Sequence, residues 1–237
     1  MLLEKMLQSQ GFGSRKHCQQ LIKSGAITLE EQLCDNLKVQ IKPEVGMHFT
    51  VYGEQYQYRE KVYIALSKPQ GYECSHQPLH HHSVFDLFPQ PLVNRGLQCV
   101  GRLDQDTTGL LLLTDDGAFL QSLTHPRKHV AKVYVVTTVD LVTDAQIQAL
   151  QQGVELRNEK GIYAATDVVR LAENCLSMTI HQGIYHQVKR MLAAVGNKVE
   201  HLHRQQVGAL VLEDLPEGEW LYLSDEQMVL AKTRTSE

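Results

Sequence analysis

The chain has 237 residues, of which 43% are hydrophobic and 21% are charged. This composition excludes intrinsic disorder, collagen-like sequence and a long coiled coil, and the length suits one large domain or a small domain beside a medium one. There is no apolar run long enough to span a membrane and no signal-peptide pattern at the N-terminus, so the cytoplasm is the expected compartment.

The five cysteines are odd in number and form no C-x-x-C pair, which disfavours a disulfide framework and a zinc knuckle. Buried, reduced thiols are expected instead. The histidines, including the run His80-His81-His82, have no cysteine or carboxylate at a recognisable metal-ligand spacing. The sequence therefore predicts no bound metal.

The formal net charge of −4 is unfavourable for a nucleic-acid-binding protein, but the charge is unevenly distributed. Basic residues gather in three stretches, at residues 1–25, 121–135 and 181–204. If the fold brings these stretches together, they form a face that can follow a phosphate backbone; if it does not, they are ordinary solvated surface.

The N-terminal part of the chain is predicted to form a compact α/β module. Helices are expected over residues 2–10 and 15–24, because Gly11 interrupts the apolar pattern and Ser14 is a favourable N-cap. Short strands are expected in three places, at residues 26–29, near Leu33 and at 47–52. The polar residues 53–61 are interpreted as a linker.

The rest of the chain is predicted to be rich in strands, with helices set apart from them. Four consecutive leucines predict a buried strand at residues 110–113, and β-branched residues predict another at 130–139. Further strands are expected at residues 62–67, 164–171, 175–180, 210–212 and 220–223, and helices at 117–123, 143–151, 188–195 and after Ser224. The fold class is therefore α+β, with a small module over residues 1–58 and a larger, mainly antiparallel sheet flanked by helices over 59–237.

The stretch from Gly101 to Gly117, GRLDQDTTGLLLLTDDG, carries the most chemical information. It predicts a polar loop with Arg102, Asp104 and Asp106 beside a buried strand, and catalytic groups are often placed on loops that a rigid strand positions. Either aspartate taken alone could instead cap a turn through its side chain.

This stretch resembles the signature of the RsuA-type branch of the pseudouridine synthases. Four further segments resemble motifs of the same family in the same order, namely residues 68–72 (KPQGY), 124–134 (THPRKHVAKVY), 183–192 (GIYHQVKRML) and 202–208 (LHRQQVG). The N-terminal module is similar to an S4-type RNA-binding domain, with Ser14-Arg15 and residues 21–25 (LIKSG) at the expected places. Together the resemblances cover nearly the whole chain.

The resemblance implies an isomerisation in which the uridine N1–C1′ bond is broken and the base is rejoined through C5, with no cofactor and no metal. Asp104 matches the family's catalytic aspartate, which acts as a nucleophile and must be ionised. Lys189 matches the basic partner that keeps this carboxylate charged. Tyr134 matches the family's tyrosine, which is expected to stack on the uracil and to accept the C5 proton. Whether the aspartate attacks C1′, attacks C6 or abstracts a sugar proton stays open.

A stacked uridine must be flipped out of its helix before it can react, and contacts with the RNA can offset that cost. Arg102 is expected either to fill the space that the base leaves or to bind a phosphate. The other expected RNA contacts are basic side chains of the module and of the larger domain: Arg15, Lys16, Lys23, Arg127, Lys128, Lys132 and Arg190.

Two departures from the family pattern lie outside these residues. The chain begins with Leu2-Leu3-Glu4-Lys5 where the family's module usually has R-L-D-K, and Ser67 replaces an asparagine before Lys68-Pro69. The first change removes a cation, so weaker RNA binding by the module is expected. The second affects a turn and not the nucleophile.

We therefore predict site-specific conversion of uridine to pseudouridine in ribosomal RNA, by a monomer that acts on an assembling ribosomal particle. Residues 68–75 (KPQGYECS) favour the 16S RNA of the small subunit. The alternatives are the same reaction on large-subunit or transfer RNA, and a non-catalytic S4-type ribosome-assembly factor. The latter would explain the basic residues of the module but not the three catalytic matches. A metal-dependent hydrolase is disfavoured by the missing ligand spacing.

Overall fold

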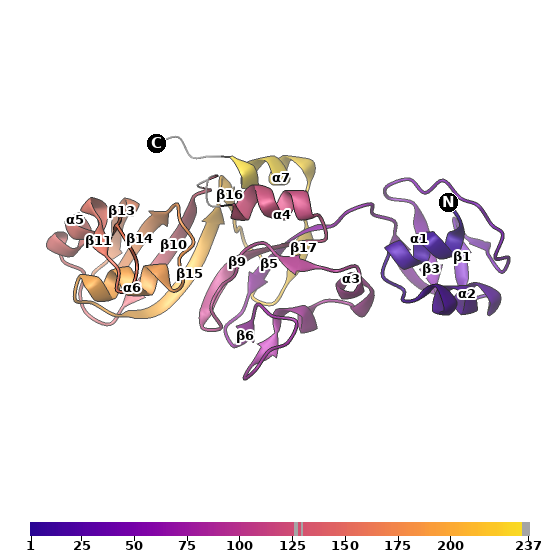
Figure 1. The fold of residues 1–237 in the computed structure, drawn as a ribbon, viewed down its shortest axis with the longest axis horizontal. Coiled ribbons are helices and arrows are strands. Elements are labelled where there is room, and N and C mark those ends of the chain that lie inside the picture. Colours follow the sequence, from indigo (N-terminus) through magenta and orange to yellow (C-terminus); the bar gives the residue numbers. More distant parts are fainter. Residues whose placement is uncertain (126–127, 129, 234–237) are drawn as a thin grey trace. The chain divides into compact units, whose positions relative to one another are not determined.

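The computed structural model of the protein describes residues 1–125, 128 and 130–233. The chain divides into two compact units (Figure 1): one comprises Met1–Val62 and Phe88–Gln98, and the other comprises Tyr63–Leu87 and Cys99–Glu237. The sequence placed the boundary after residue 58 and gave the whole remainder to the second domain. In the structure, the later segment Phe88–Gln98 belongs to the first unit instead.

Residues Met1–Val62 of the first unit form two helices and a four-stranded sheet. Helix α1 (Leu3–Ser9) and helix α2 (Arg15–Lys23) were both predicted, and the Ser14 side chain caps α2 by accepting a hydrogen bond from the His17 backbone N–H. The sheet has the order β2-β1-β3-β4. Its strands are antiparallel and short, with the bounds β1 (Ile27–Leu29), β2 (Gln32–Leu33), β3 (His48–Val51) and β4 (Glu54–Gln57).

Strand β4 corrects the sequence interpretation, which assigned residues 53–61 to a linker. The strand is an edge strand, and three of its four residues are exposed, so it lacks the alternating apolar pattern of a half-buried strand. The Tyr56 ring anchors the strand to the core of the unit, because it stacks on Phe49 with 5.5 Å between the ring centroids and meets the Phe12 ring edge-on at 4.9 Å. Backbone pairing with β3 and these two ring contacts order the strand.

The segment Phe88–Gln98 packs with the first unit because two of its side chains bind backbone groups there. It contains the short helix α3 (Gln90–Asn94). The Arg95 guanidinium donates to the carbonyl oxygens of Arg59 and Glu60 at 2.9 and 3.1 Å, and the Asn94 amide donates to the carbonyl of Gly11 at 3.1 Å. These contacts join residues far apart in the sequence, and no local pattern reveals them.

The second unit is built on a nine-stranded sheet with the main order β13-β14-β10-β15-β9-β5-β17. The β15–β9 pair is parallel and the other pairs along this order are antiparallel. The strands of this order are β5 (Tyr63–Lys68), β9 (Thr107–Thr114), β10 (Lys132–Thr138), β13 (Thr166–Ala172), β14 (Cys175–Ile180), β15 (Val199–Val207) and β17 (Trp220–Tyr222). Off this order lie β8 (Gln98–Cys99) and β16 (Leu210–Val211). The predicted α+β class is confirmed.

Among the described residues, four α-helices, a 3-10 helix and four short strands complete this unit. Figure 1 shows α4 (Gly117–Thr124) beside α7 (Asp225–Lys232), while α5 (Asp144–Gln152) and α6 (Gln187–Ala194) lie at the end of the sheet that holds β13 and β14. Two short pairs lie outside the large sheet, β6 (Tyr72–Glu73) with β7 (His82–Ser83) and β11 (Val154–Glu155) with β12 (Ile162–Tyr163). A 3-10 helix, η1, covers Val84–Leu87.

The parallel pair of β9 and β15 brings the aspartate loop to the middle of the sheet. Gly109 lies opposite Arg204 in this pair, and a Cβ atom at Gly109 would lie 2.8 Å from the Arg204 backbone nitrogen, which is closer than packing allows. Only glycine lets the two backbones approach this closely. Strand β9 is buried along nearly its whole length, so the loop that precedes it starts from a rigid base.

Within the described residues, no helix is both long and apolar enough to cross a membrane.

Candidate active site

The loop before β9 presents two carboxylates and is anchored by its backbone. Leu103 is buried, with 6% of its surface exposed, and its neighbour Asp104 is 29% exposed. The Asp104 carbonyl accepts a hydrogen bond from the Thr107 N–H at 3.1 Å, which closes a turn. Gly71, in the turn after β5, donates its N–H to the carbonyl of Gln105 at 2.8 Å. The loop is therefore held by its own turn and by a hydrogen bond from the turn after β5.

Lys68 also holds the loop that precedes β9. Its side chain is fully buried, and its ammonium group donates to the carbonyl oxygens of Pro69, Gln105 and Thr107 at 3.0, 3.3 and 2.9 Å. Burial lowers the pKa of Lys68. The three carbonyl groups replace the water that this cation loses, as a buried charge requires.

Helix α6 brings the cation to the carboxylates. Val188, Met191 and Leu192 are buried, which fixes the rotation of the helix, and Lys189 extends from its first turn toward the loop. The Lys189 ammonium lies 3.0 Å from Asp104 Oδ2 and 2.6 Å from Asp106 Oδ1. One lysine thus joins both carboxylates of a loop that lies more than 80 residues earlier in the chain.

His186 is the fourth member of this cluster. It immediately precedes α6, and its Nε2 atom lies 3.2 Å from Asp104 Oδ1. Each of the two Asp104 oxygens therefore has its own partner, Lys189 on Oδ2 and His186 on Oδ1. A carboxylate bonded at both oxygens keeps one orientation.

The charges of the cluster support one another. Partial burial alone would raise the pKa of Asp106, but the hydrogen bond and positive charge of Lys189 outweigh it, so this pKa is lowered. Burial alone would lower the pKa of Lys189, but Asp106 and Asp104 outweigh it and the pKa is raised. The lysine therefore stays protonated and its partner Asp106 stays ionised at neutral pH.

Two cysteines lie under the loop beside the buried cation. The Cys74 sulfur accepts a hydrogen bond from the Leu103 N–H at 3.4 Å. A hydrogen bond from the Cys99 thiol, helped by the nearby charges of Lys68 and Arg204, lowers the pKa of Cys74 to about 7 despite its burial. The same thiol contact raises the pKa of Cys99. The five cysteines are free thiols, of which Cys18 is buried as expected and the other four are partly exposed.

Comparison with known proteins decides what this cluster belongs to. The family model of RNA pseudouridylate synthases matches residues 62–194, which contain both the aspartate loop and α6. The chain belongs to the RNA pseudouridylate synthase family.

Full-length relatives show which branch of the family the chain is similar to. The chain is 39% identical over 231 residues to the ribosomal small subunit pseudouridine synthase A of Vibrio vulnificus, covering 96% of this chain and 98% of the relative. It is 36% identical over 229 residues to the protein of that name from Escherichia coli K12, with the same coverage. A crystal structure of a pseudouridylate synthase is 35% identical and superposes with a TM-score of 0.69 over 98% of this chain and 99% of the other. The predicted RsuA-type resemblance is confirmed, and the chain is an RNA pseudouridine synthase.

Tyr134 lies in the sheet of the synthase and not in the ion-paired cluster. It is 7% exposed on β10, opposite Met178 of β14 and Arg204 of β15. Its hydroxyl has no hydrogen bond to any residue that the structure describes. Its assignment as the base that accepts the C5 proton stays a prediction.

The basic residues predicted to bind RNA near the site have differing surroundings. Arg102, two residues before Asp104, is exposed. Lys128 is exposed as well. Lys132 is half-buried, and burial together with the charge of Arg204 lowers its pKa to about 8. Its ammonium group donates to the carbonyl of Val130 at 2.7 Å. Arg127 lies outside the described residues.

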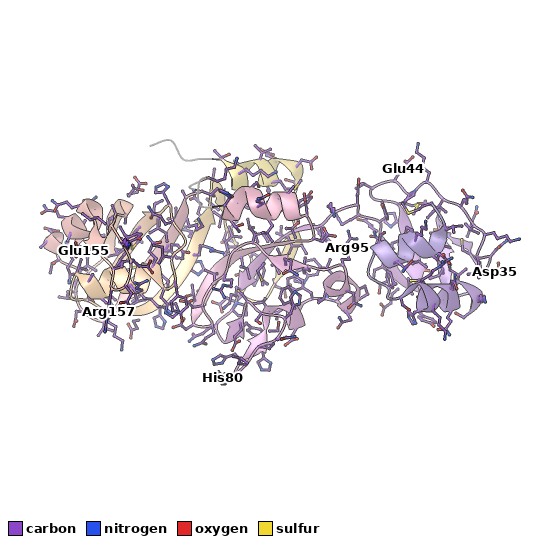
Figure 2. All side chains as sticks on the ribbon, in the orientation of Figure 1. Asp35, Glu44, His80, Arg95, Glu155 and Arg157 are labelled. Atoms are coloured by element: carbon purple, nitrogen blue, oxygen red, sulfur yellow. The ribbon has the colours of Figure 1, made fainter. Side chains whose placement is uncertain are left out.

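Arg190 does not point freely toward a phosphate or solvent as expected. Its guanidinium lies 3.1 Å from the Glu159 carboxylate and also donates to the carbonyl oxygens of Tyr185 and Arg157. Figure 2 labels Arg157 close to α6. The helical spacing gave the correct side of α6, but the loop between β11 and β12 covers that side, so Arg190 ties this loop to the helix.

In the first unit, Arg15 has a structural partner. It pairs at 2.7 Å with Glu4, whose side chain is 2% exposed, while Arg15 itself remains 68% exposed. Glu4 is one of the residues at which the chain departs from the family pattern. Lys16 and Lys23 are exposed on the same helix, α2. All three cations remain accessible on this helix.

Sequence reasoning missed the roles of His186 and Asp106 in the cluster. The spacing could have indicated His186, because it lies three residues before Lys189, and residues three apart share a face at the start of a helix. Asp106 was noted in the loop, but nothing local shows that it shares the lysine with Asp104. In the described residues, no group of three or more His, Cys, Asp or Glu side chains could hold a metal ion.

Proposed function

We propose that this enzyme converts one uridine of small-subunit ribosomal RNA to pseudouridine, with Asp104 as the nucleophile. The observation that carries the proposal is the Asp104 carboxylate itself, which is 29% exposed and ion-paired with Lys189 at 3.0 Å. An accessible carboxylate whose charge is compensated on one side can act on a substrate on the other. The names of the full-length relatives favour the small-subunit substrate.

The cluster suits an isomerisation in which atoms are neither added nor removed. The N1–C1′ bond of the uridine breaks, the uracil turns, C5 bonds to C1′, and the proton lost from C5 is balanced by one gained at N1. Asp104 interacts with the nucleoside while the base is detached. Lys189 pairs with its carboxylate, and Asp106 shares that lysine and moderates its charge. Tyr134 is the proposed acceptor of the C5 proton.

RNA binding is proposed to use both units. Lys16 and Lys23 are exposed on α2 of the first unit and suit contacts with a phosphate backbone. Arg102 and Lys128 are exposed on the second unit, with Arg102 two residues before the nucleophile. These contacts would offset the few kcal/mol needed to flip a base out of its helix. We place the reaction in the cytoplasm, on an assembling ribosomal particle, and carried out by a monomer.

The test is pseudouridine mapping on unmodified ribosomal RNAs, by carbodiimide treatment and primer extension. Small- and large-subunit RNAs are used free and in assembling particles, with the wild type and with Asp104→Asn. We expect one new stop on small-subunit RNA with the wild type and none with the variant. Asp214→Asn, at an exposed position between β16 and β17, is the matched control and keeps the stop.

Binding of each variant to the same RNA is measured across a salt series. Asp104→Asn is expected to bind within about twofold of the wild type with the same salt slope, because phosphate contacts set that slope. A stop retained by Asp104→Asn would refute the nucleophile. A wild-type stop on large-subunit RNA alone would refute the substrate. Tight binding with no stop on any RNA would favour an assembly factor.

A further inference from the structure

His186 has a backbone conformation that its side-chain contacts explain. Its φ and ψ angles are 52° and 33°, in the left-handed region that non-glycine residues seldom adopt. It occupies the N-cap position of α6, yet its side chain makes no capping hydrogen bond. A residue at this position usually stabilises the helix by capping it. Here the side chain is directed elsewhere, at a cost in backbone strain.

The imidazole of His186 is directed at the nucleophile. Its Nε2 atom lies 3.2 Å from Asp104 Oδ1, within reach of a hydrogen bond. The left-handed backbone at His186 makes the sharp turn from the preceding loop into α6, and this turn places the imidazole and Lys189 on the same side of Asp104.

A second ring fixes the imidazole. The Tyr185 ring stacks on the His186 ring, with 3.8 Å between the centroids and 19° between the planes. The loop that carries both rings is itself bonded, because the Gln187 side chain accepts from the Ile184 N–H and donates to the Gln182 side chain. The ring therefore approaches Asp104 from a supported position.

We propose that His186 is a positioning residue for Asp104. Lys189 alone would bond only one carboxylate oxygen, which leaves the carboxylate free to rotate about the Cβ–Cγ bond. A hydrogen bond from His186 Nε2–H to Oδ1 sets the plane of the carboxylate and so the direction of the lone pairs that face the substrate. Small errors in such an orientation reduce rates strongly. The charged groups around the imidazole are Asp104, Asp106 and Lys189, with the Tyr185 ring on its face. This inference rests on the proposed role of Asp104.

Three substitutions separate the hydrogen bond from the ring and from the backbone. His186→Phe keeps a ring to stack on Tyr185 but removes the donor. His186→Gln removes the ring and restores an N–H at about the distance of Nε2. His186→Asn tolerates the left-handed backbone better than glutamine does, but its amide is one bond too short. His201→Phe, at an exposed histidine of β15, is the control for a histidine-to-phenylalanine change.

The measurement is single- and multiple-turnover kinetics on the RNA that the wild type modifies, with the melting temperature of every variant. We expect kcat to fall about 30-fold in His186→Phe, as for a lost hydrogen bond to a charged group, with KM unchanged within about twofold. His186→Gln should recover to within about threefold of the wild type, and His186→Asn should not. If His186 only served the backbone conformation, His186→Asn should be faster than His186→Gln, because asparagine adopts the left-handed conformation more readily.

The outcomes also separate this inference from the proposed function. Asp104→Asn is assayed in parallel, and turnover by that variant would refute the nucleophile and the inference together. Loss of turnover in Asp104→Asn with wild-type kcat in His186→Phe would overturn the inference alone. If His186→Phe does not fold, the glutamine and asparagine variants decide, and glutamine no faster than asparagine overturns the proposal.

Discussion

Lys68 and Lys189 contact the same loop from two regions of the larger unit, and their surroundings differ. Lys68 is fully buried and bonds only to backbone carbonyl groups, and burial lowers its pKa. Lys189 is 24% exposed and bonds to two carboxylates, which raise its pKa against the effect of burial. Lys68 therefore fixes the position of the loop. Lys189 keeps the Asp106 carboxylate of the loop ionised.

This difference predicts that the two lysines contribute to different properties. A buried cation bonded to carbonyl groups cannot be removed without leaving those groups unpaired, so it contributes to stability. A partly exposed ion pair contributes little to stability, because water competes for both charges. With Asp104 as the proposed nucleophile, the ion pair can still be essential to the reaction, because it orients the carboxylate.

The largest effect is expected for Lys68→Met, which keeps the volume of the side chain but removes its donors. Three carbonyl groups lose a hydrogen bond, and at about 1 kcal/mol or more each the free energy of unfolding should fall by about 3 kcal/mol. Turnover should fall at least a hundredfold, because the loop loses its support. Urea unfolding and single-turnover kinetics measure both effects. Unchanged stability would show that Lys68 does not hold the loop.

A smaller loss of stability, with a comparable loss of rate, is expected for Lys189→Met. Its two ion pairs are partly exposed, so the free energy of unfolding should fall by about 1 kcal/mol at most. Turnover should fall about a hundredfold, because Asp104, the proposed nucleophile, loses the partner that orients it. Lys189→Arg is the matched control and should retain most of the rate. Equal losses of stability in Lys68→Met and Lys189→Met would remove the distinction between the two lysines.

The pH dependence of stability sharpens the comparison further. The pKa of Asp106 is lower in the folded state than its usual value of 3.8, because the contact with Lys189 outweighs burial. A depressed carboxylate pKa contributes stability above the unfolded-state pKa, and the contribution is lost as the pH falls through the folded-state value. The stability advantage of the wild type over Asp106→Asn should therefore be constant from about pH 5 to 7 and shrink below about pH 4. Urea unfolding of both proteins at each pH measures it, and an advantage that grows toward pH 3 would contradict the assignment.

The sequence predicted much of this arrangement where the signals are local. The helices α1 and α2, the leucine strand within β9 and the helix carrying Lys189 follow from apolar spacing and capping residues. The resemblance also paired Lys189 with Asp104, which the structure places 3.0 Å apart. These features depend on patterns within one segment or on a motif that spans the site.

Other features depend on contacts that no single segment records. Strand β15 was missed because histidines, Glu200 and Arg204 interrupt its apolar pattern, although Arg204 is 2% exposed. Its place between β10 and β9 explains this, since the neighbouring strand offers Arg204 Nε a backbone partner, the Leu110 carbonyl at 2.8 Å. The contacts of Arg190 with the 157–159 loop were also not foreseen, because only the fold brings that loop to α6, and its contact with RNA stays a prediction.

The smallest effect concerns the thiol beneath the loop. The hydrogen bond from Cys99 and the charges of Lys68 and Arg204 lower the pKa of Cys74 to about 7, whereas burial and the charge of Asp35 raise the pKa of Cys34. Because the thiolate is the reactive form, alkylation of Cys74 by iodoacetamide should rise with pH to half its maximum near pH 7, while Cys34 reacts only at higher pH. Mass spectrometry of alkylated peptides measures both rates in one sample. Lys68→Arg keeps a cation beside Cys74 and should leave its midpoint in place. A Cys74 midpoint as high as that of Cys34 would show that neither the Cys99 hydrogen bond nor the buried cations stabilise the thiolate.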